Sequence, residues 1–142
     1  MMSAQAPQRL QLRVAQFRFI ARLETQTAPR SVALLTRMLP IERSVLHARW
    51  SGEAGWVPLG SGLELAAENA TAYPQPGQLL LYAGTQSEAE LLIPYGACAF
   101  ASRAGRLAGN PVAMIEGDLS PLRALGEMLL WKGAQTIELE LL

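Results

Sequence analysis

Two segments that each combine a strand with a helix bracket this chain, and they limit the folds that are open to it. Near the start, an alternating strand runs directly into the helix-prone segment 27–35. Near the end, segment 113–119 leads into a second helix, which stops at Gly133 and returns as strand 134–141. The stretch between them consists of short apolar runs separated by glycine and proline, a pattern typical of antiparallel strands. The sequence therefore predicts a mainly β protein, a closed antiparallel barrel capped by two α-helices.

Residue spacing defines the first strand and helix. From residue 14 the pattern has period two, which indicates a half-buried strand with an apolar face formed by Phe17, Phe19, Ala21 and Leu23. Thr27 is expected to cap the following helix, Pro29 suits its first turn, and Pro40 ends it. Residues 1–12 are polar and irregular, so we expect a flexible N-terminal segment ahead of a single domain over 13–142.

The remaining elements are bounded by turn residues. Strands are expected at 44–49, 55–59, 78–81, 97–101 and 111–115. Asp118 or Ser120 can cap the second helix, with Pro121 in its first turn. The buried stripe of that helix is expected to consist of Leu122, Leu125, Met128 and Leu129.

The charges of the chain argue against two classes of partner. Lysine and arginine number 12, and aspartate and glutamate also number 12, so the formal net charge is zero. Such a chain lacks the electrostatic attraction expected for nucleic acid or an anionic membrane. Arginines nevertheless concentrate in the first fifty residues. Either this asymmetry marks a basic surface, or the two halves interleave in one barrel and neutralise each other.

Few residues are available for metal, redox or cofactor chemistry. Cys98 is the only cysteine, which excludes an intramolecular disulfide, and its small apolar neighbours favour a buried thiol. His47 is the only histidine, and no phosphate loop or dinucleotide fingerprint is present. We therefore expect no metal and no cofactor. No segment is long and apolar enough to span a bilayer, and arginines interrupt any secretory signal, which predicts a cytoplasmic protein.

Segment 49–53 carries the densest group of chemically useful side chains. A guanidinium matches a planar carboxylate, and an indole stacks on a ring or an amide. Arg49, Trp50 and Ser51 are therefore predicted ligand-binding residues, with Glu53 beside them as a candidate catalytic carboxylate. The competing interpretation is a hairpin edge in which Arg49 pairs with Glu53 while Trp50 and Trp56 pack on the barrel rim.

Glu88, Glu90 and Tyr95 form a second group, placed between a turn and an apolar strand. A partly buried carboxylate can act as a general base once its pKa rises, which makes Glu88 a second candidate catalytic residue. Tyr95 is a candidate ligand contact. Carboxylates in turns are more often simply solvated. Asn110 can offer its amide to a ligand carbonyl, or it can form a turn before the following proline.

The order of these elements resembles the cyclophilin-like barrel over residues 14–142. Several motifs also look like those of an uncharacterised bacterial family with that fold: Arg49–Ala54, Tyr73–Gly77, Ser87–Glu88, Ile93–Gly96, Leu107–Asn110 and Leu130–Gln135. True cyclophilins carry a Phe-His-Arg strand and a Gln-Gly-Gly turn, and His47-Ala48-Arg49 is only weakly similar to the first of these. The resemblance implies the fold and makes peptidyl-prolyl isomerase the least favoured activity.

Two functions remain open. In the first, a pocket at the barrel mouth binds a small polar metabolite that bears a carboxylate or an amide. In the second, the protein is a cofactor-independent enzyme of the hydrolase, lyase or isomerase type acting on a small amide or carbonyl compound, with Glu88 or Glu53 as base and Arg49 as anchor. Analogy with other barrels of this kind suggests an accessory role beside an amide-metabolising enzyme. A homo-oligomer is also expected, because apolar residues load the terminal strand: Ile137, Leu139, Leu141 and Leu142.

Overall fold

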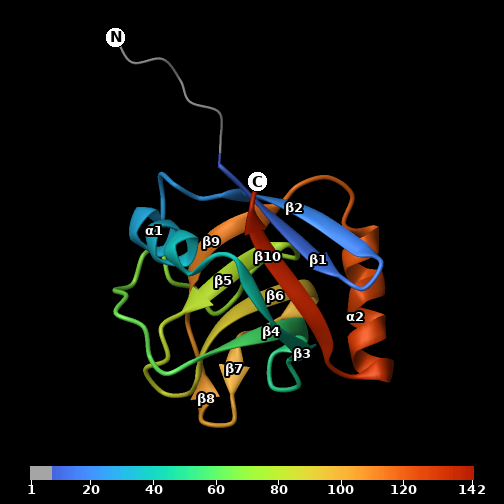
Figure 1. Cartoon of the computed structure of the whole chain (residues 1–142). Coiled ribbons are helices and arrows are strands. Elements are labelled where there is room, and N and C mark those ends of the chain that lie inside the picture. The colour runs from blue at the N-terminus through green and yellow to red at the C-terminus, as the bar shows by residue number, and fades with distance from the viewer. Residues whose placement is uncertain (1–7) are drawn as a thin grey trace.

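In the computed structural model, which describes residues 8–142, eight strands close into a barrel and two helices pack against it (Figure 1). All neighbouring barrel strands are antiparallel, in the order β1-β10-β3-β4-β6-β5-β9-β2. The barrel strands are β1 (Arg9–Val14), β2 (Phe17–Leu23), β3 (Ile41–His47), β4 (Gly52–Gly60), β5 (Gln78–Tyr82), β6 (Ala89–Cys98), β9 (Asn110–Ile115) and β10 (Gln135–Leu141). This confirms the predicted mainly β fold, a closed antiparallel barrel with two helices.

The two helices lie on opposite sides of the barrel (Figure 1). They are α1 (Pro29–Met38) and α2 (Ser120–Lys132). Their apolar stripes join the inward-facing strand side chains in one core cluster, to which α1 contributes Val32 and Leu35 and α2 contributes Leu122, Leu125 and Leu129. Because this cluster fills the barrel, burial of apolar surface holds strands and helices together as one unit.

The helix starts differ from the sequence-based expectation. Thr27 does not cap α1: the N-cap residue is Ala28, and the first backbone N–H groups of the helix are bound by Glu68 from a distant loop. Leu119 is the N-cap residue of α2, and the carboxylate of the preceding Asp118 accepts a hydrogen bond from the Ser120 N–H at 3.0 Å. Gly133 ends α2 with a positive φ of 85°, as predicted.

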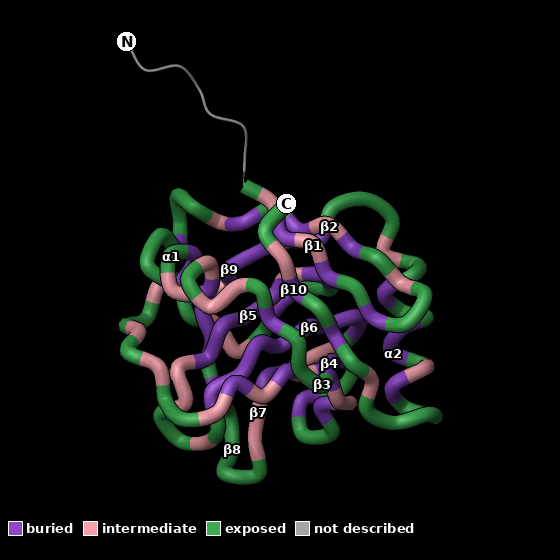
Figure 2. Tube along the Cα trace, viewed as in Figure 1, coloured by how far each residue is buried: buried purple, intermediate pink, exposed green. Residues whose placement is uncertain are grey.

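Burial alternates along the strands that face solvent on one side, as Figure 2 shows for β1 and β2. Residues 9–12, expected to belong to an irregular segment, instead form most of β1, because both β2 and β10 pair with them. Residues 1–7 of the predicted flexible segment lie outside the described residues. The predicted period-two strand over 17–23 is confirmed as β2.

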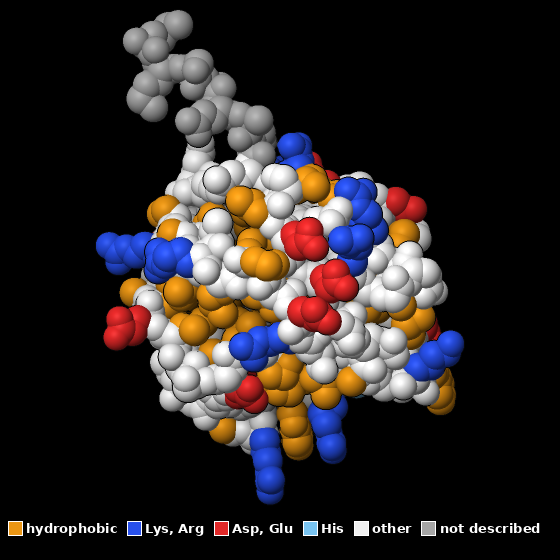
Figure 3. All heavy atoms as spheres, in the orientation of Figure 1, with side chains coloured by type: hydrophobic (Ala, Val, Ile, Leu, Met, Phe, Trp, Pro, Cys, Tyr) orange, Lys and Arg blue, Asp and Glu red, His pale blue; other side chains and the backbone are white. Residues whose placement is uncertain are grey.

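Acidic and basic side chains are intermixed on the face of the molecule in Figure 3. Pairing between the two ends of the chain contributes to this: Arg13 of β1 lies 3.4 Å from Glu140 of β10, and Arg9 forms a 2.6 Å ion pair with Glu116. The N-terminal arginines therefore interleave with acids from the C-terminal half, as the second interpretation of the charge asymmetry requires.

A second, smaller apolar cluster lies on the outer side of the barrel wall. After β6, residues 99–109 fold back over β4, β5 and β6 and include a small hairpin formed by β7 (Ala101–Ser102) and β8 (Gly105–Arg106). The cluster contains Leu80, Tyr82, Leu92, Phe100 and Leu107. It covers the outer face of β6, so eight successive residues from Ala89 to Gly96 are buried.

This double burial explains the largest error in the strand assignment. A strand at 97–101 was predicted, but β6 occupies Ala89–Cys98 and the chain leaves the barrel at residue 99. Because both faces of β6 are covered, its sequence shows no alternation of apolar and polar residues. The predicted strands at 78–81 and 111–115 are present as β5 and β9.

The terminal strand β10 turns most of its apolar side chains inward. Ile137 and Leu139 are fully buried in the barrel core, because β10 pairs with both β1 and β3. The barrel itself accounts for these two residues. Self-association stays a prediction, now supported by the exposed side chains of Leu130, Trp131, Leu141 and Leu142.

Candidate functional site

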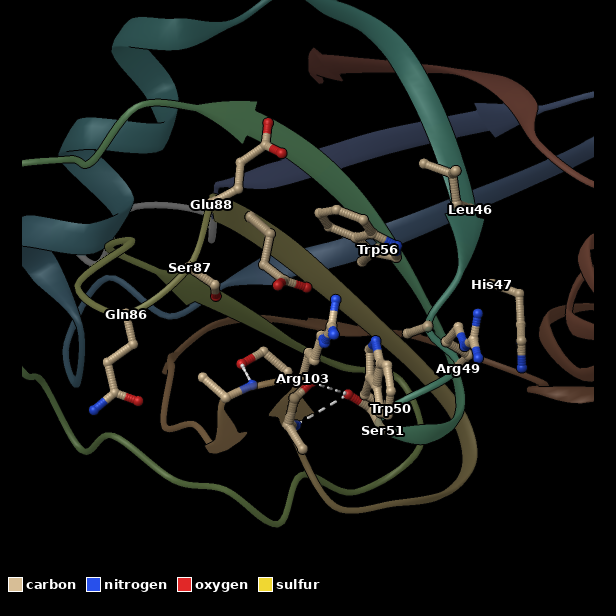
Figure 4. Close-up of a pocket in the computed structure, with 15 residues that line it drawn as sticks. Leu46, His47, Arg49, Trp50, Ser51, Trp56, Gln86, Ser87, Glu88 and Arg103 are labelled. Carbon is tan, nitrogen blue, oxygen red and sulfur yellow. Dashed lines mark hydrogen bonds between the residues drawn. The ribbon is translucent and has the colours of Figure 1, made fainter.

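A pocket of about 730 Å³ lies where three segments distant in sequence meet on the outer wall of the barrel (Figure 4). The end of β3 and its turn supply residues 46–51, the loop before β6 supplies residues 86–88 and the start of β6 supplies Glu90, and the β7–β8 hairpin supplies residues 101–104. Trp56 of β4 also lines it. A barrel-mouth pocket was expected, but core side chains fill the barrel interior and this pocket lies outside it.

Arg49 and Trp50, two of the predicted ligand-binding residues, occupy the β3–β4 turn and line the pocket. The Arg49 guanidinium carbon lies 5.0 Å from the centroid of the Trp50 ring, a cation–π arrangement. The alternative pairing of Arg49 with Glu53 does not form. The Glu53 carboxylate instead accepts a hydrogen bond from the Ala97 N–H at 2.7 Å, and no ion pair among residues 8–142 includes Arg49.

Ser51 also lines the pocket, but its hydroxyl group is already engaged. Its Oγ donates to the Ala101 carbonyl and accepts from the Ala101 N–H, both at 3.1 Å. These contacts, drawn as dashed lines in Figure 4, tie the β3–β4 turn to the β7–β8 hairpin. Ser51 therefore positions the pocket walls, and its buried hydroxyl contributes to the shape of the site.

Glu88 and Glu90 line the pocket together, because residues two apart at the start of a strand project from the same face. Glu88 is exposed and accepts a hydrogen bond from the Gly60 N–H at 3.1 Å. Glu90 is only 7% exposed. Burial, and then repulsion from Glu88, raises the pKa of Glu90 to about 8, so its carboxyl group is mostly protonated at pH 7.

Tyr95 lies away from the pocket. Its side chain belongs to the barrel core, beneath α2, and its hydroxyl lies 3.3 Å from Nδ1 of His47. A Cβ atom added to Gly126 of α2 would overlap the Tyr95 ring, so helix and strand are in close contact there. Burial raises the pKa of the Tyr95 phenol. Alternation explains the placement: Tyr95 is an odd-numbered residue of β6 like the core residues Leu91 and Ile93, whereas Glu90 faces outward.

Asn110 is also outside the pocket, and its amide is fully occupied. Its Oδ1 accepts a hydrogen bond from the Glu68 N–H, and its Nδ2 donates to the Ser31 hydroxyl and the Ala66 carbonyl, all at 2.9 Å. Of the predicted site residues, the structure thus brings together Arg49, Trp50, Ser51 and Glu88, and leaves out Glu53, Tyr95 and Asn110.

Several pocket residues were not foreseen from the sequence. Arg103 enters from the β7–β8 turn, and Ser87 and Trp56 complete the walls (Figure 4). The Ser87 Oγ is buried and makes no hydrogen bond of regular geometry in the described part of the chain, although its side chain lies close to the Tyr82 hydroxyl. The glycine at position 105 is the sequence signal for the tight turn that carries Arg103, and in the structure Gly105 has a φ of 123°. That the turn would face Arg49 depends on how residues 99–109 fold back over the barrel.

Two negative observations apply to the described residues. No group of three or more His, Cys, Asp or Glu side chains within residues 8–142 is arranged to hold a metal ion. Over the same residues, neither helix has the combined length and apolar character that would let it cross a membrane. Cys98 is half-buried, and burial raises the pKa of its thiol to about 11.

Solved structures share this architecture at low sequence identity. The structure of McbB in complex with tryptophan aligns with a TM-score of 0.73 and 19% identity, over 92% of this chain and 44% of McbB. The chain thus spans less than half the length of that protein. The solution structure of the hypothetical protein AF2241 from Archaeoglobus fulgidus aligns with a TM-score of 0.67 and 16% identity, over 99% of this chain and 98% of the other. At these identities the likeness concerns the fold.

Comparison with curated proteins gave no match. A family model, by contrast, covers almost the whole chain, from residue 10 to residue 141. That model describes proteins of unknown function, in keeping with the resemblance to an uncharacterised family with a barrel fold. The chain therefore belongs to the family described as protein of unknown function (DUF3830).

Proposed function

We propose that the outer-wall pocket binds a small metabolite in which a carboxylate or an amide is joined to an apolar or aromatic group. The observation that carries the proposal is the position of Arg49. Its guanidinium lies over the Trp50 ring at the pocket wall and takes part in no ion pair within residues 8–142. A guanidinium in this position can form two parallel hydrogen bonds to a carboxylate while a neighbouring indole contacts the rest of the ligand.

The other walls of the pocket suit the same kind of molecule. Leu46, Trp50 and Trp56 offer apolar surface, and Arg103 brings a second guanidinium from the opposite segment. Figure 4 shows Trp50, Trp56 and Arg103 around the centre of the view, with Arg49 to one side. Concave, mostly apolar sites with a few polar groups are typical of small-molecule binding.

One solved structure with the same fold contains a molecule of this ligand class. McbB, which shares the fold, was solved with tryptophan, a molecule that joins a carboxylate to an aromatic ring. At 19% identity the comparison says nothing of individual residues in this chain. It does make indole carboxylates a reasonable first group of probes.

The test is calorimetric titration of the protein with indole-3-propionate and its neutral amide. We expect saturable binding of at least one of them. Arg49→Ala should weaken binding of the carboxylate about tenfold or more, because a charge-assisted contact is lost. Arg123→Ala is the matched control, since Arg123 is exposed on α2 and lies outside the pocket. In melting curves, Arg49→Ala should lose the stabilisation by ligand while the ligand-free melting temperature stays nearly unchanged.

Two results would contradict the proposal. Absence of binding across a wider panel of small carboxylates and amides would remove the function itself. A large drop in ligand-free stability of Arg49→Ala, with the ligand response intact, would show that Arg49 is part of the scaffold and that the site lies elsewhere.

A second function is favoured by one feature, the buried Glu90 carboxyl group that lines the pocket and whose pKa burial raises to about 8. A carboxyl group with a pKa near neutrality can act as a general acid or base, as expected for a cofactor-independent enzyme acting on a small amide or carbonyl compound. Glu90 takes the place of Glu53, which lies outside the pocket and binds the Ala97 N–H. The two functions differ in whether the ligands are recovered unchanged after prolonged incubation with the protein.

A further inference from the structure

We propose that the ligand of this pocket is a zwitterion of the α-amino acid type, whose ammonium group lies at Glu88 and Glu90 while its carboxylate lies at Arg49 and Arg103. This inference rests on the proposed function and deepens it by naming a second charged group on the ligand. It follows from the arrangement of the two acidic and two basic side chains around one cavity.

The Glu90 carboxyl group is an almost completely buried acid at the pocket wall. Its side chain lines the pocket, yet the residue is only 7% exposed. The influences on its carboxyl group are burial and the charge of Glu88, with no hydrogen-bond donor and no cation among them. Ionisation of a carboxyl group that is mostly buried and has no cation beside it is costly, so a position of this kind at a pocket wall suits a positive partner that arrives from outside.

Glu88 and Ser87 offer further oxygen atoms beside Glu90 in the pocket. The Glu88 carboxylate lies close enough to Glu90 to affect its ionisation. The buried Ser87 Oγ makes no hydrogen bond of regular geometry within residues 8–142, although its side chain lies close to the Tyr82 hydroxyl. Ser87, Glu88 and Glu90 all line the pocket. A primary ammonium group has three donors and no acceptor, so two carboxylates and a hydroxyl oxygen match its needs.

The acidic and the basic side chains of the pocket are separate from each other. No ion pair within residues 8–142 joins Glu88 or Glu90 to Arg49 or Arg103, so the acidic and basic groups of the cavity are not paired with each other. In Figure 4, Glu88 and Arg49 lie at opposite sides of the pocket, with Trp56 between them in the view. A ligand with one negative and one positive group and an apolar body would satisfy both ends and the indole surfaces together.

A simple carboxylate does not meet all these conditions, because it would leave Glu90 without a partner. A neutral amide would accept a hydrogen bond from protonated Glu90 and leave its protonation unchanged. An ammonium group instead favours the ionised form of Glu90. Binding of a zwitterion near pH 7 should therefore release a proton, which gives the proposal a signature that simple affinity does not have.

The titratable groups around Glu90 determine how proton release on binding is interpreted. Glu88 is the charged neighbour that affects it. Glu90 in turn acts on Cys98, whose thiol pKa is raised to about 11 by burial, so the thiol is neutral near pH 7. His47 is another side chain of the pocket that can exchange a proton. Loss of proton release in Glu90→Gln therefore assigns the released proton to Glu90.

The experiment uses matched trios of ligands, each consisting of an amino acid, its deamino carboxylate and its decarboxylated amine. The trios are L-tryptophan, indole-3-propionate and tryptamine; L-phenylalanine, 3-phenylpropionate and phenethylamine; and L-leucine, 4-methylpentanoate and isopentylamine. Titration calorimetry at pH 7 in buffers of different ionisation enthalpy gives the affinity and the number of protons released. In at least one trio, the zwitterion should bind about tenfold more tightly than either partial analogue.

Glu90→Gln provides the variant, because glutamine resembles the protonated carboxyl group in size and hydrogen bonding. In this variant the advantage of the amino acid over its deamino analogue should fall to about threefold or less, and proton release should disappear. Wild-type protein should release close to one proton per amino acid bound and none with the deamino carboxylate. Glu42→Gln, an exposed change on β3, is the control and should behave as the wild type.

The possible results separate the two proposals. Equal or tighter binding of the deamino carboxylate overturns the zwitterion while leaving the proposed function intact. Zwitterion preference without proton release, or unchanged by Glu90→Gln, also overturns the assignment of the ammonium group to Glu90. Amines that bind as well as the amino acids contradict the placement of a carboxylate at Arg49 and Arg103 and overturn the zwitterion. Failure of every trio, together with failure of the amides, removes the proposed function.

Discussion

At the scale of single residues, Asn110 connects three parts of the chain that are far apart in sequence. Its amide binds the Glu68 N–H, the Ala66 carbonyl and the Ser31 hydroxyl. Glu68 in turn accepts hydrogen bonds from the Ser31 and Arg30 N–H groups at the start of α1. Burial opposes the ionisation of Glu68, but these bonds outweigh it and hold the pKa of Glu68 below its usual value. A carboxylate from a loop thus caps the helix in place of a local side chain.

Replacing Asn110 by alanine should lower the free energy of unfolding by about 2–3 kcal/mol, because buried partners lose their hydrogen bonds. Chemical denaturation at neutral pH measures the change. Thr25→Ala, an exposed change in the turn before α1, is expected to stay within about 0.5 kcal/mol of the wild type. A neutral Asn110→Ala would mean that water replaces the amide and that the network contributes little.

At the scale of elements, α2 and β6 come into close contact through Gly126 and Tyr95. The helix has no side chain at this point, which leaves room for the Tyr95 ring between helix and strand. The predicted buried stripe of α2 is confirmed for Leu122, Leu125 and Leu129, whereas Met128 is only half-buried. Gly126 forms part of the buried surface, so a residue unfavourable for helix formation is retained for packing.

Gly126→Ala tests this contact, because two effects of opposite sign compete. Alanine favours the helix over glycine by about 1 kcal/mol, whereas inserting a methyl group into a packed interior costs about 1–3 kcal/mol. Tyr95 is held by its hydrogen bond to His47 and by the barrel, so we expect the packing cost to win and the melting temperature to fall. Arg123→Ala on the exposed side of α2 serves as reference. A higher melting temperature for Gly126→Ala would show that the ring moves aside freely.

At the scale of the whole molecule, the pocket exists because residues 99–109 leave the barrel and cover its outer wall. This excursion buries the second apolar cluster and places Arg103 on the same cavity as Arg49 and Glu90. Burial of Glu90 is a consequence of this tertiary arrangement, and it makes the stability of the whole domain depend on pH.

The sign of that dependence follows from the two pKa values of Glu90. The usual value is 4.5, and the folded protein raises it to about 8. Below the lower value the group is neutral in both states and its favourable effect on the folded state is fully present. As the pH rises to about 8, the unfolded chain ionises first, and stability is lost at about 1.4 kcal/mol per pH unit. Glutamine does not ionise, so Glu90→Gln should not show this loss.

Urea denaturation between about pH 5 and 8, a range that lies between the two pKa values of Glu90, measures the difference in stability. The stability of Glu90→Gln relative to the wild type should increase steadily over this range. Glu42→Gln should run parallel to the wild type, because Glu42 is exposed on β3. Parallel curves for all three proteins would indicate that the Glu90 carboxyl group ionises as it does in water, and that the pocket is more hydrated than its burial implies.

Helices and strands could be predicted where they depend on interactions between residues close in sequence, and were missed where they depend on distant segments. Apolar residues alternate with polar ones from Phe17 to Leu23, and leucines recur at helical spacing from Leu122 to Leu129. β2 and α2 can therefore be predicted from residues that are only a few positions apart. β6 is a mostly apolar strand of 10 residues without such alternation, because the excursion after it covers its outer face. No local pattern carries that information.

The candidate site divides in the same way. Arg49, Trp50 and Ser51 were found because they are adjacent in a turn that holds a guanidinium, an indole and a hydroxyl together. Tyr95 and Asn110 were expected in the pocket from their chemistry, but one faces the barrel core and the other is held by Ser31, Glu68 and Ala66. Residue type defines what a side chain is able to do, whereas the face of the strand decides where it does it.

The class of fold, the two helices, the strands with one solvent-facing side and the turn that bears Arg49 could all be predicted from the amino-acid sequence. Each of these depends on periodicity or turn chemistry within about ten residues. The position of the pocket on the outer wall, the presence of Arg103 in it and the burial of Glu90 arise from long-range packing. Burial and charge proximity depend on which distant segments cover a surface, and here residues 99–109 cover it.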